Sequence, residues 1–248
     1  MSSWERRAFA TGPRPCLDRR VRFLEGSLIL AYRSCPEIVL DIVERWSGPL
    51  LLIGGGMIVV TSIIHPQGTG SQFVLQSLWM PVHIIEYFAW MIILLGFVGW
   101  YSRFSTSLGR LGTLGFLLFF FAGATGGGYS LWINVLLEPY MAANSPSLEN
   151  GLSTNSGYIA TFLTVGFALV VGYLVFSVAV VRARVLPRWG LWLIVLQIIA
   201  LAFFFGVAIA FAAFLVFSAL FGLGIAGWGY ALLSTRRRVE SSERLQVG

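Results

Sequence analysis

The sequence predicts an all-α, polytopic membrane protein with six transmembrane helices and with both termini on the cytoplasmic side. Composition is the first observation, because 57% of the 248 residues are hydrophobic and 11% are charged, whereas a soluble domain carries about 25% charged residues. Hydropathy patterning is the second, since the apolar residues form long runs separated by short polar stretches. The third is the placement of the arginines, which identifies the loops on one side of the membrane.

The first four spans follow from the apolar runs, because a membrane helix needs roughly 20 mostly apolar residues. The first is expected at 50–64, where Gly48 and Pro49 suit a helix start and His65 and Pro66 a helix stop. The next three are expected at 79–101, 113–137 and 157–181. Each is bounded by polar or turn-forming residues.

The last apolar run, 189–233, is too long for one span. As a single helix it would extend about 68 Å at 1.5 Å per residue, which is twice the thickness of a bilayer. We therefore expect it to fold back on itself and to form the fifth and sixth spans. The small residues at 206–213 are the expected turn.

The arginines test the span count, because short cytoplasmic loops accumulate them and exported loops do not. All 17 basic residues are arginine, and eight of them precede the first span. The others follow the second, fourth and sixth spans: Arg103, Arg110, Arg182, Arg184, Arg188, Arg236, Arg237, Arg238 and Arg244. Five spans would place the C-terminal arginines outside, so six are predicted.

The chain divides into three parts: a cytoplasmic segment at 1–47, the six-helix domain at 48–234 and a cytoplasmic tail at 235–248. Residues 35–46 have the spacing of an amphipathic helix. This segment either lies along the inner membrane interface or belongs to a loosely ordered leader that an upstream start codon adds. Cys16 and Cys35 would face a reducing compartment, so no structural disulfide is expected.

One group of polar residues is the candidate site. His65 ends the first span, and His83 and Glu86 lie three residues apart on one face of the second. Glu138 ends the third span at the same membrane level, with Asn134 and Tyr129 one and two turns deeper. Ionisable groups at membrane depth are costly and usually face the bundle interior, so we expect His83 and Glu86 to point inward, and a role in substrate or proton passage is one interpretation of the cluster.

Other interpretations of the cluster stay open. His65 can simply reach the wet interface, and His83 and Glu86 can hydrogen-bond each other or a neighbouring helix. A bis-histidine haem or a metal held by His65, His83 and Glu86 is a further alternative. Two histidines and one glutamate are a minimal ligand set, however, and nothing else in the sequence requires a metal. We therefore expect no cofactor.

Glycine and aromatic residues have structural explanations. Gly54 to Gly56 in the first span and the Gly123–Gly127 GxxxG pair in the third predict close helix packing, with a broken helix around a substrate cavity as the alternative. Aromatic residues near the span ends are interpreted as interfacial anchors. They are Trp79, Trp100, Tyr101, Trp189, Trp192 and Trp228.

The inner loop from Arg182 to Gly190 resembles the Arg-x-Leu-Pro-x-Trp-x-Gly loop of certain uncharacterised bacterial multi-pass membrane proteins. The stretch from Gly128 to Tyr140 is similar to theirs as well. The resemblance implies a multi-pass protein of the bacterial cytoplasmic membrane. It implies no activity and no site residues.

Familiar catalytic patterns such as HExxH, GxSxG and GxGxxG are absent from the sequence. We therefore expect a non-enzymatic protein, either a small transporter-like or binding module or an accessory membrane subunit. The alternative is a membrane enzyme or electron carrier with a histidine-ligated metal or haem. The expected partners are the lipid bilayer and a second copy or another membrane subunit, and no nucleic acid, because the arginines lie beside spans.

Overall fold

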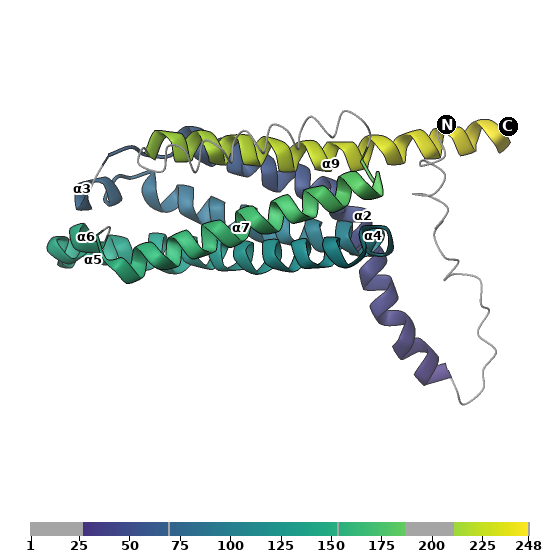
Figure 1. Cartoon of the computed structure of the whole chain (residues 1–248), viewed down its shortest axis with the longest axis horizontal. Helices are drawn as coiled ribbons and strands as arrows, with labels where there is room; N and C mark the ends of the chain where they lie inside the picture. Colours follow the sequence, from purple (N-terminus) through teal and green to yellow (C-terminus); the bar gives the residue numbers. More distant parts are fainter. Residues whose placement is uncertain (1–26, 69, 153, 187–210, 248) are drawn as a thin grey trace.

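The protein is a bundle of long helices that lie along a common axis (Figure 1). The computed structural model describes residues 27–68, 70–152, 154–186 and 211–247. Every regular element in these ranges is helical, as predicted. The elements are α2 (Ser27–Ile64), α3 (Ser71–Val74), α4 (Trp79–Tyr129), η1 (Ser130–Leu137), α5 (Glu138–Asn144), α6 (Pro146–Leu152), α7 (Ser156–Ala183) and α9 (Phe211–Val247).

Four helical stretches among the described residues are long and apolar enough to cross a membrane: Ile42–Ile64, Trp79–Asn144, Ser156–Ala183 and Leu215–Ser234. The expected spans at 79–101, 113–137 and 157–181 fall within the second and third of them. The fold is therefore that of an all-helical, multi-pass membrane protein.

The second stretch is 66 residues long and folds back on itself at Gly109. Gly109 has φ 60° and ψ −161°, a conformation open to glycine and strained for other residues. The two arms then pack side by side, with the rings of Phe97 and Phe119 4.3 Å apart and those of Tyr101 and Phe116 4.2 Å apart. The turn lies between the second and third expected spans, as the sequence predicts.

The first span begins earlier than expected. Helix α2 starts at Ser27 and continues through Gly48 and Pro49, so the expected start at Pro49 is wrong and the expected boundary at 47/48 falls inside a helix. A proline inside a helix removes one backbone hydrogen bond but does not end the helix when packing supports it. Figure 1 shows the N-terminal part of α2 leaving the bundle at an angle.

Glycines allow the helices to approach closely. A Cβ atom on Gly55 of α2 would lie 2.5 Å from both the backbone nitrogen of Ala226 and the carbonyl oxygen of Gly222 in α9. In the α4 hairpin, a Cβ on Gly123 would lie 3.1 Å from Leu94, and one on Gly127 would lie 3.0 Å from Trp90. These contacts agree with the packing role predicted for both glycine groups.

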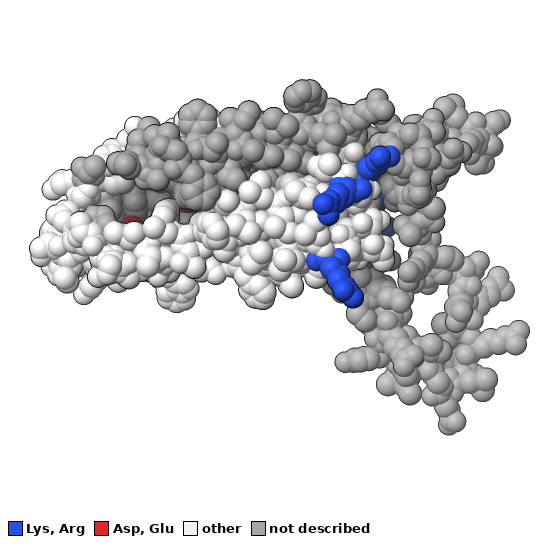
Figure 2. All heavy atoms as spheres, viewed as in Figure 1, with Lys and Arg blue, Asp and Glu red and all other residues white. Residues whose placement is uncertain are grey.

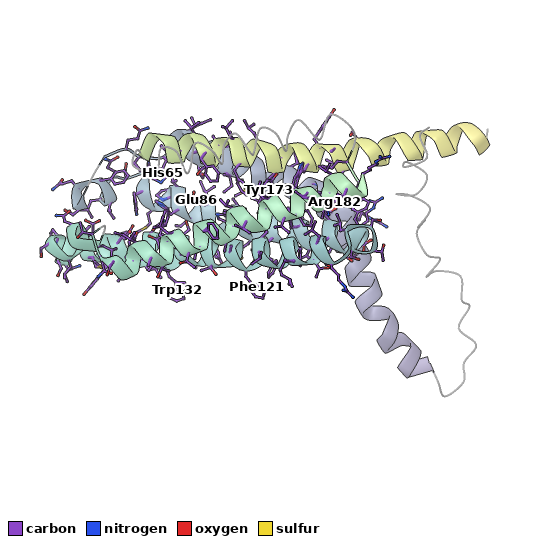
Figure 3. All side chains as sticks on the ribbon, viewed as in Figure 1. His65, Glu86, Phe121, Trp132, Tyr173 and Arg182 are labelled. Carbon is purple, nitrogen blue, oxygen red and sulfur yellow. The ribbon has the colours of Figure 1, made fainter. Side chains whose placement is uncertain are left out.

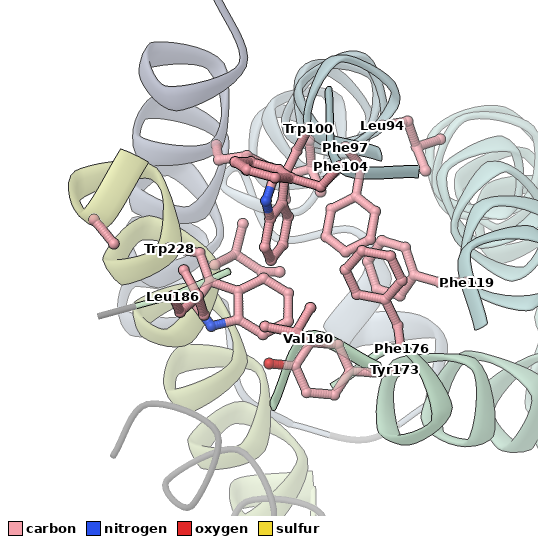
Figure 4. Close-up of a cluster of buried hydrophobic side chains, with 14 of the residues drawn as sticks. Leu94, Phe97, Trp100, Phe104, Phe119, Tyr173, Phe176, Val180, Leu186 and Trp228 are labelled. Carbon is pink, nitrogen blue, oxygen red and sulfur yellow. The ribbon is translucent and has the colours of Figure 1, made fainter. Parts of the chain in front are cut away.

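Aromatic side chains fill the core (Figure 4). Trp100 of α4 and Trp228 of α9 are both 0% exposed, and their ring centroids are 4.6 Å apart. Phe97 and Phe176 pack around them. The expectation that Trp100 and Trp228 anchor the protein at the interface is therefore wrong, because both belong to the core.

Several expectations concern residues outside the described ranges. Cys16, Arg188, Trp189 and Trp192 are among them. The expected turn at 206–213 also lies mostly outside the described ranges, because Phe211 is the first described residue after 186.

Candidate functional site

The two ends of the bundle differ in charge. The end that we call the arginine end carries Arg103, Arg110, Arg182 and Arg184, whereas His65, His83, Glu86, Glu138 and Glu149 lie towards the other, the histidine end. Figure 2 shows the blue arginine atoms gathered towards the right of the molecule and red carboxyl atoms at the back of a hollow on the left. Figure 3 labels His65 and Glu86 on the left and Arg182 on the right.

The two histidines of the chain lie against each other. His65 directly follows α2, and His83 lies in the second turn of α4. Their Nε2 atoms are 3.4 Å apart, and their rings are nearly perpendicular with centroids 5.0 Å apart. The exposed fractions are 8% for His65 and 3% for His83. Both rings are therefore largely covered by other parts of the protein.

Backbone carbonyls hold the other nitrogen of each ring. His65 Nδ1 lies 2.8 Å from the Pro66 oxygen, and His83 Nδ1 lies 2.8 Å from the Trp79 oxygen. A carbonyl oxygen only accepts, so each Nδ1 carries the hydrogen and donates it. Burial lowers the pKa of His65, against the opposing effect of its bond to Pro66. The Trp79 ring packs over the pair, 4.3 Å from His83 and 5.7 Å from His65.

Short helices cover the pair. Val74, Trp79 and Ala142 form a small apolar cluster between α3, α4 and α5. The N-terminus of α3 is fixed to α6, because the backbone nitrogen of Ser71 donates to Asn150 Oδ1 at 2.9 Å. Trp79 Nε1 donates to the backbone oxygen of Asn134 at 2.7 Å, so Asn134 contributes its backbone carbonyl to this end.

Glu86 forms a second polar group with a residue of the opposite arm. Ser130 Oγ donates to Glu86 Oε2 at 3.0 Å, and Ser130 is buried. His83 and Glu86 thus both face neighbouring helices, as the sequence predicts. Ser130 begins η1, a π-helix, a local widening that often occurs at functional sites. The third expected span does not end at 137, because η1 continues into α5 as far as Asn144.

Glu138 forms a third polar group. Tyr158, in the first turn of α7, donates from its hydroxyl to Glu138 Oε1 at 3.1 Å. The hydroxyl of Tyr129 is hydrogen-bonded to that of Tyr158. Glu138 and the nearby Glu149 of α6 are 7% and 9% exposed, and burial raises the pKa of Glu149.

Five of the six candidate residues therefore belong to three adjoining groups: the histidine pair, Glu86 with Ser130, and Glu138 with the two tyrosines. The sixth, Asn134, takes part through its backbone oxygen alone. Within the described ranges, no three histidine, cysteine or acidic residues come close enough to hold a metal together. Glu86 accordingly does not complete a three-residue metal site with the histidines. A bis-histidine haem does not fit either, because a porphyrin must lie between two imidazoles that here are in contact.

The sequence interpretation missed Ser130, Tyr158 and Glu149. A usable signal existed for Tyr158, since it is a polar residue in the first turn of an expected span at the level of Glu138. Ser130 and Glu149 carried no such signal. A serine is common in membrane helices, and the burial of Glu149 depends on the fold of α5 and α6.

No family model, curated protein or solved structure matches the chain. A functional proposal therefore depends on the geometry of the histidine end.

Proposed function

We propose that the chain crosses the membrane six times, with both termini in the cytoplasm and with the histidine end facing outward. The fold of the α4 hairpin supports this count, because its two arms supply two crossings and the described residues then offer five. The apolar run at 189–233 has the length for one crossing before Leu215–Ser234. The arginine distribution supports the orientation.

We infer that the protein is a transporter-like binding module that takes a small cation at the histidine end. The observation that supports this most strongly is the presence of two carboxyls, those of Glu86 and Glu138, at one end of the bundle. Each carboxyl is hydrogen-bonded by a hydroxyl, from Ser130 and Tyr158 respectively, and no described residue at this end is an arginine. A carboxyl at membrane depth needs a proton or a cation to offset its charge. The hydroxyls that bond these two carboxyls are neutral, so we infer that a cation taken up from solution offsets the charge.

The orientation is tested with reporter fusions after Gly151 and after Leu233. The six-span arrangement places these positions on opposite sides, the first outside and the second inside. A phosphatase that is active only outside and a fluorescent protein that matures only inside should therefore give opposite readings at the two positions. The same reading at both positions would contradict the arrangement.

The binding function is tested by cation-dependent thermal stabilisation of the detergent-purified protein. Ligand at 100 times its Kd stabilises a protein by about 2.7 kcal/mol. We expect a member of a panel of monovalent, divalent and organic cations to raise the Tm of the wild type, and Glu86→Gln to weaken that response while leaving the folded yield nearly intact.

Glu44→Gln is the matched control, because Glu44 accepts a similar hydrogen bond from Ser102 Oγ, at 2.8 Å, towards the arginine end. This variant should keep the cation response of the wild type. If the whole panel fails to stabilise the wild type, or if both variants respond alike, the binding function is wrong. A purely structural role of Glu86 would instead lower the Tm without changing the response to cations.

A further inference from the structure

The arginine end brings together cations from two helices that pack against each other. Arg182 and Arg184 lie at the C-terminal end of α7, and Arg110 lies beside the turn of the α4 hairpin. A Cβ atom on Gly112 would lie 3.5 Å from the Cβ of Ala179, so this turn packs against the end of α7. The three arginines are exposed, and Figure 2 shows arginine side chains projecting from this end.

These cations lie where the apolar part of each helix ends. The membrane-crossing stretch of α7 ends at Ala183, between Arg182 and Arg184, and the hairpin turn ends both arms of α4. In a bilayer this is the level of the lipid headgroups. Glu44, which lies towards the same end, already accepts a hydrogen bond from Ser102. Lipid phosphate is therefore the anion that these arginines meet at this level.

The end of α7 keeps an arginine where glycine is the usual residue. Arg184 directly follows the helix with φ 53° and ψ 39°, which is the left-handed conformation. Among the described residues it is the only one other than glycine with a positive φ. This conformation is strained for a residue with a Cβ atom, and glycine commonly takes this place. Such strain at an exposed position indicates a use for the side chain.

Exposed apolar side chains continue from the arginines along the same helix faces. On the second arm of α4 they follow Arg110 at intervals of three or four residues, which places them on one face: Leu114, Leu117 and Phe121. On α7, the exposed Val178 lies one turn before Arg182. Figure 3 shows Phe121 at the outer edge of the bundle. A cation beside a line of apolar side chains fits a phosphate group that carries acyl chains.

We propose that Arg110, Arg182 and Arg184 bind the headgroup of an anionic phospholipid, whose acyl chains lie along the exposed apolar side chains of α4 and α7. A guanidinium holds phosphate oxygens through two parallel hydrogen bonds. Basic residues next to a membrane helix attract anionic lipids. This proposal does not rest on cation binding at the histidine end, because it concerns the opposite end of the bundle.

The test is native mass spectrometry of the full-length protein in detergent with equal amounts of phosphatidylglycerol and phosphatidylcholine that carry the same acyl chains. We expect the wild type to prefer phosphatidylglycerol by about tenfold or more. Arg110→Gln and Arg182→Gln should each weaken phosphatidylglycerol binding about fivefold and leave phosphatidylcholine binding unchanged. Arg184→Gly should weaken it similarly without lowering the Tm in lipid-free detergent, because glycine adopts this conformation without strain.

Arg182→Lys is the matched control, because it keeps the charge and loses the planar pair of donors. It should bind phosphatidylglycerol more weakly than the wild type does. If it binds as tightly, the attraction is a diffuse effect of charge and the site is wrong. Equal binding of both lipids by the wild type would overturn the proposal without any variant. Displacement of the lipid by inorganic phosphate would show that the site takes soluble phosphate, and the lipid assignment would then be wrong.

Discussion

The two ends of the bundle contain the same pair of side chains in different settings. Ser102 donates to Glu44 at 2.8 Å towards the arginine end, and Ser130 donates to Glu86 at 3.0 Å towards the histidine end. Arg45 and Arg103 directly follow Glu44 and Ser102 in the sequence, whereas no arginine is a sequence neighbour of Glu86 or Ser130. A serine–glutamate bond at membrane depth therefore does not reveal its role by itself. Its role depends on which charges accompany it.

The ends also differ in how they are held together. Towards the arginine end, large aromatic rings from α4, α7 and α9 pack into a continuous core (Figure 4). Towards the histidine end, hydrogen bonds of His65, Glu86 and Glu138 join the elements, beside a small apolar cluster of Val74, Trp79 and Ala142. In a bilayer, packing supplies most of the association between helices, and single polar contacts add less. Substitutions in the aromatic core should consequently destabilise the fold more than substitutions at the histidine end.

The largest expected effect is that of Trp228→Ala. Trp228 is 0% exposed and touches Trp100, Tyr173 and Phe97. The free energy of unfolding should fall by about 3 kcal/mol, the lower end of the range for aromatic-to-alanine changes in soluble cores, because lipid solvates the apolar surface in the unfolded state. Denaturant-induced unfolding in mixed micelles measures it. Trp132→Ala is the control, since Trp132 is 66% exposed, and equal losses in the two variants would contradict the location of the core.

A smaller loss is expected from Tyr158→Phe at the histidine end. The change removes the hydroxyl that donates to Glu138 and bonds to Tyr129. Interhelical hydrogen bonds in membranes contribute about 0.6 kcal/mol on average and up to about 1.7 kcal/mol, so we expect a loss of about 1–2 kcal/mol. The same unfolding assay applies, with Tyr140→Phe as the control because Tyr140 is 67% exposed. A loss as large as that of Trp228→Ala would mean that the histidine end, too, determines stability.

The two serine–glutamate pairs compare the ends directly. Ser130→Ala and Ser102→Ala each remove one hydroxyl donor to a carboxyl. We expect Ser130→Ala to cost about 1 kcal/mol and Ser102→Ala about half as much, because Ser130 is buried and a group left without a partner costs more when water cannot reach it. Unfolding curves for both variants in one detergent check the order. The reverse order would show that the stability of the protein depends more on the hydrogen bond at the arginine end than on the one at the histidine end.

The sequence predicts the helical class and the polar group because both depend on local patterns. Apolar runs locate the stretches that cross the membrane, and the turn at Gly109 falls where arginines separate two runs. The spacing of His83 and Glu86 places them on one face. Their inward direction follows from the cost of exposing polar atoms to lipid.

The rest depends on tertiary contacts that no local pattern reveals. Pro49 indicated a helix start, but α2 continues through it, because the remaining hydrogen bonds and the packing on α4 and α9 outweigh one lost bond. Trp100 and Trp228 had the position of interfacial anchors, but their neighbours on other helices place them in the core. The two histidine rings meet through the fold of α2 against α4, and the carbonyls of Pro66 and Trp79 that accept from their Nδ1 atoms have no signature in the sequence.

The smallest expected effect is a pH dependence at Glu149, a residue at the histidine end for which the described contacts give Oε2 no hydrogen-bond partner. Burial raises its pKa above the ordinary value of 4.5, so the folded state holds the proton more tightly than the unfolded state does. The stability from this group is therefore complete at low pH and is lost as the pH rises above about 4.5 towards the raised pKa.

Glu149→Gln cannot ionise and escapes this loss. The variant should match the wild type near pH 4 and become the more stable of the two, by about 1 kcal/mol or less, as the pH approaches 7. Thermal unfolding at pH values from 4 to 8 measures the difference. Parallel curves for the two proteins would mean that Glu149 is solvated in the folded state as freely as in the unfolded chain, and the short helices would then cover the histidine end less completely than the burial of Glu149 indicates.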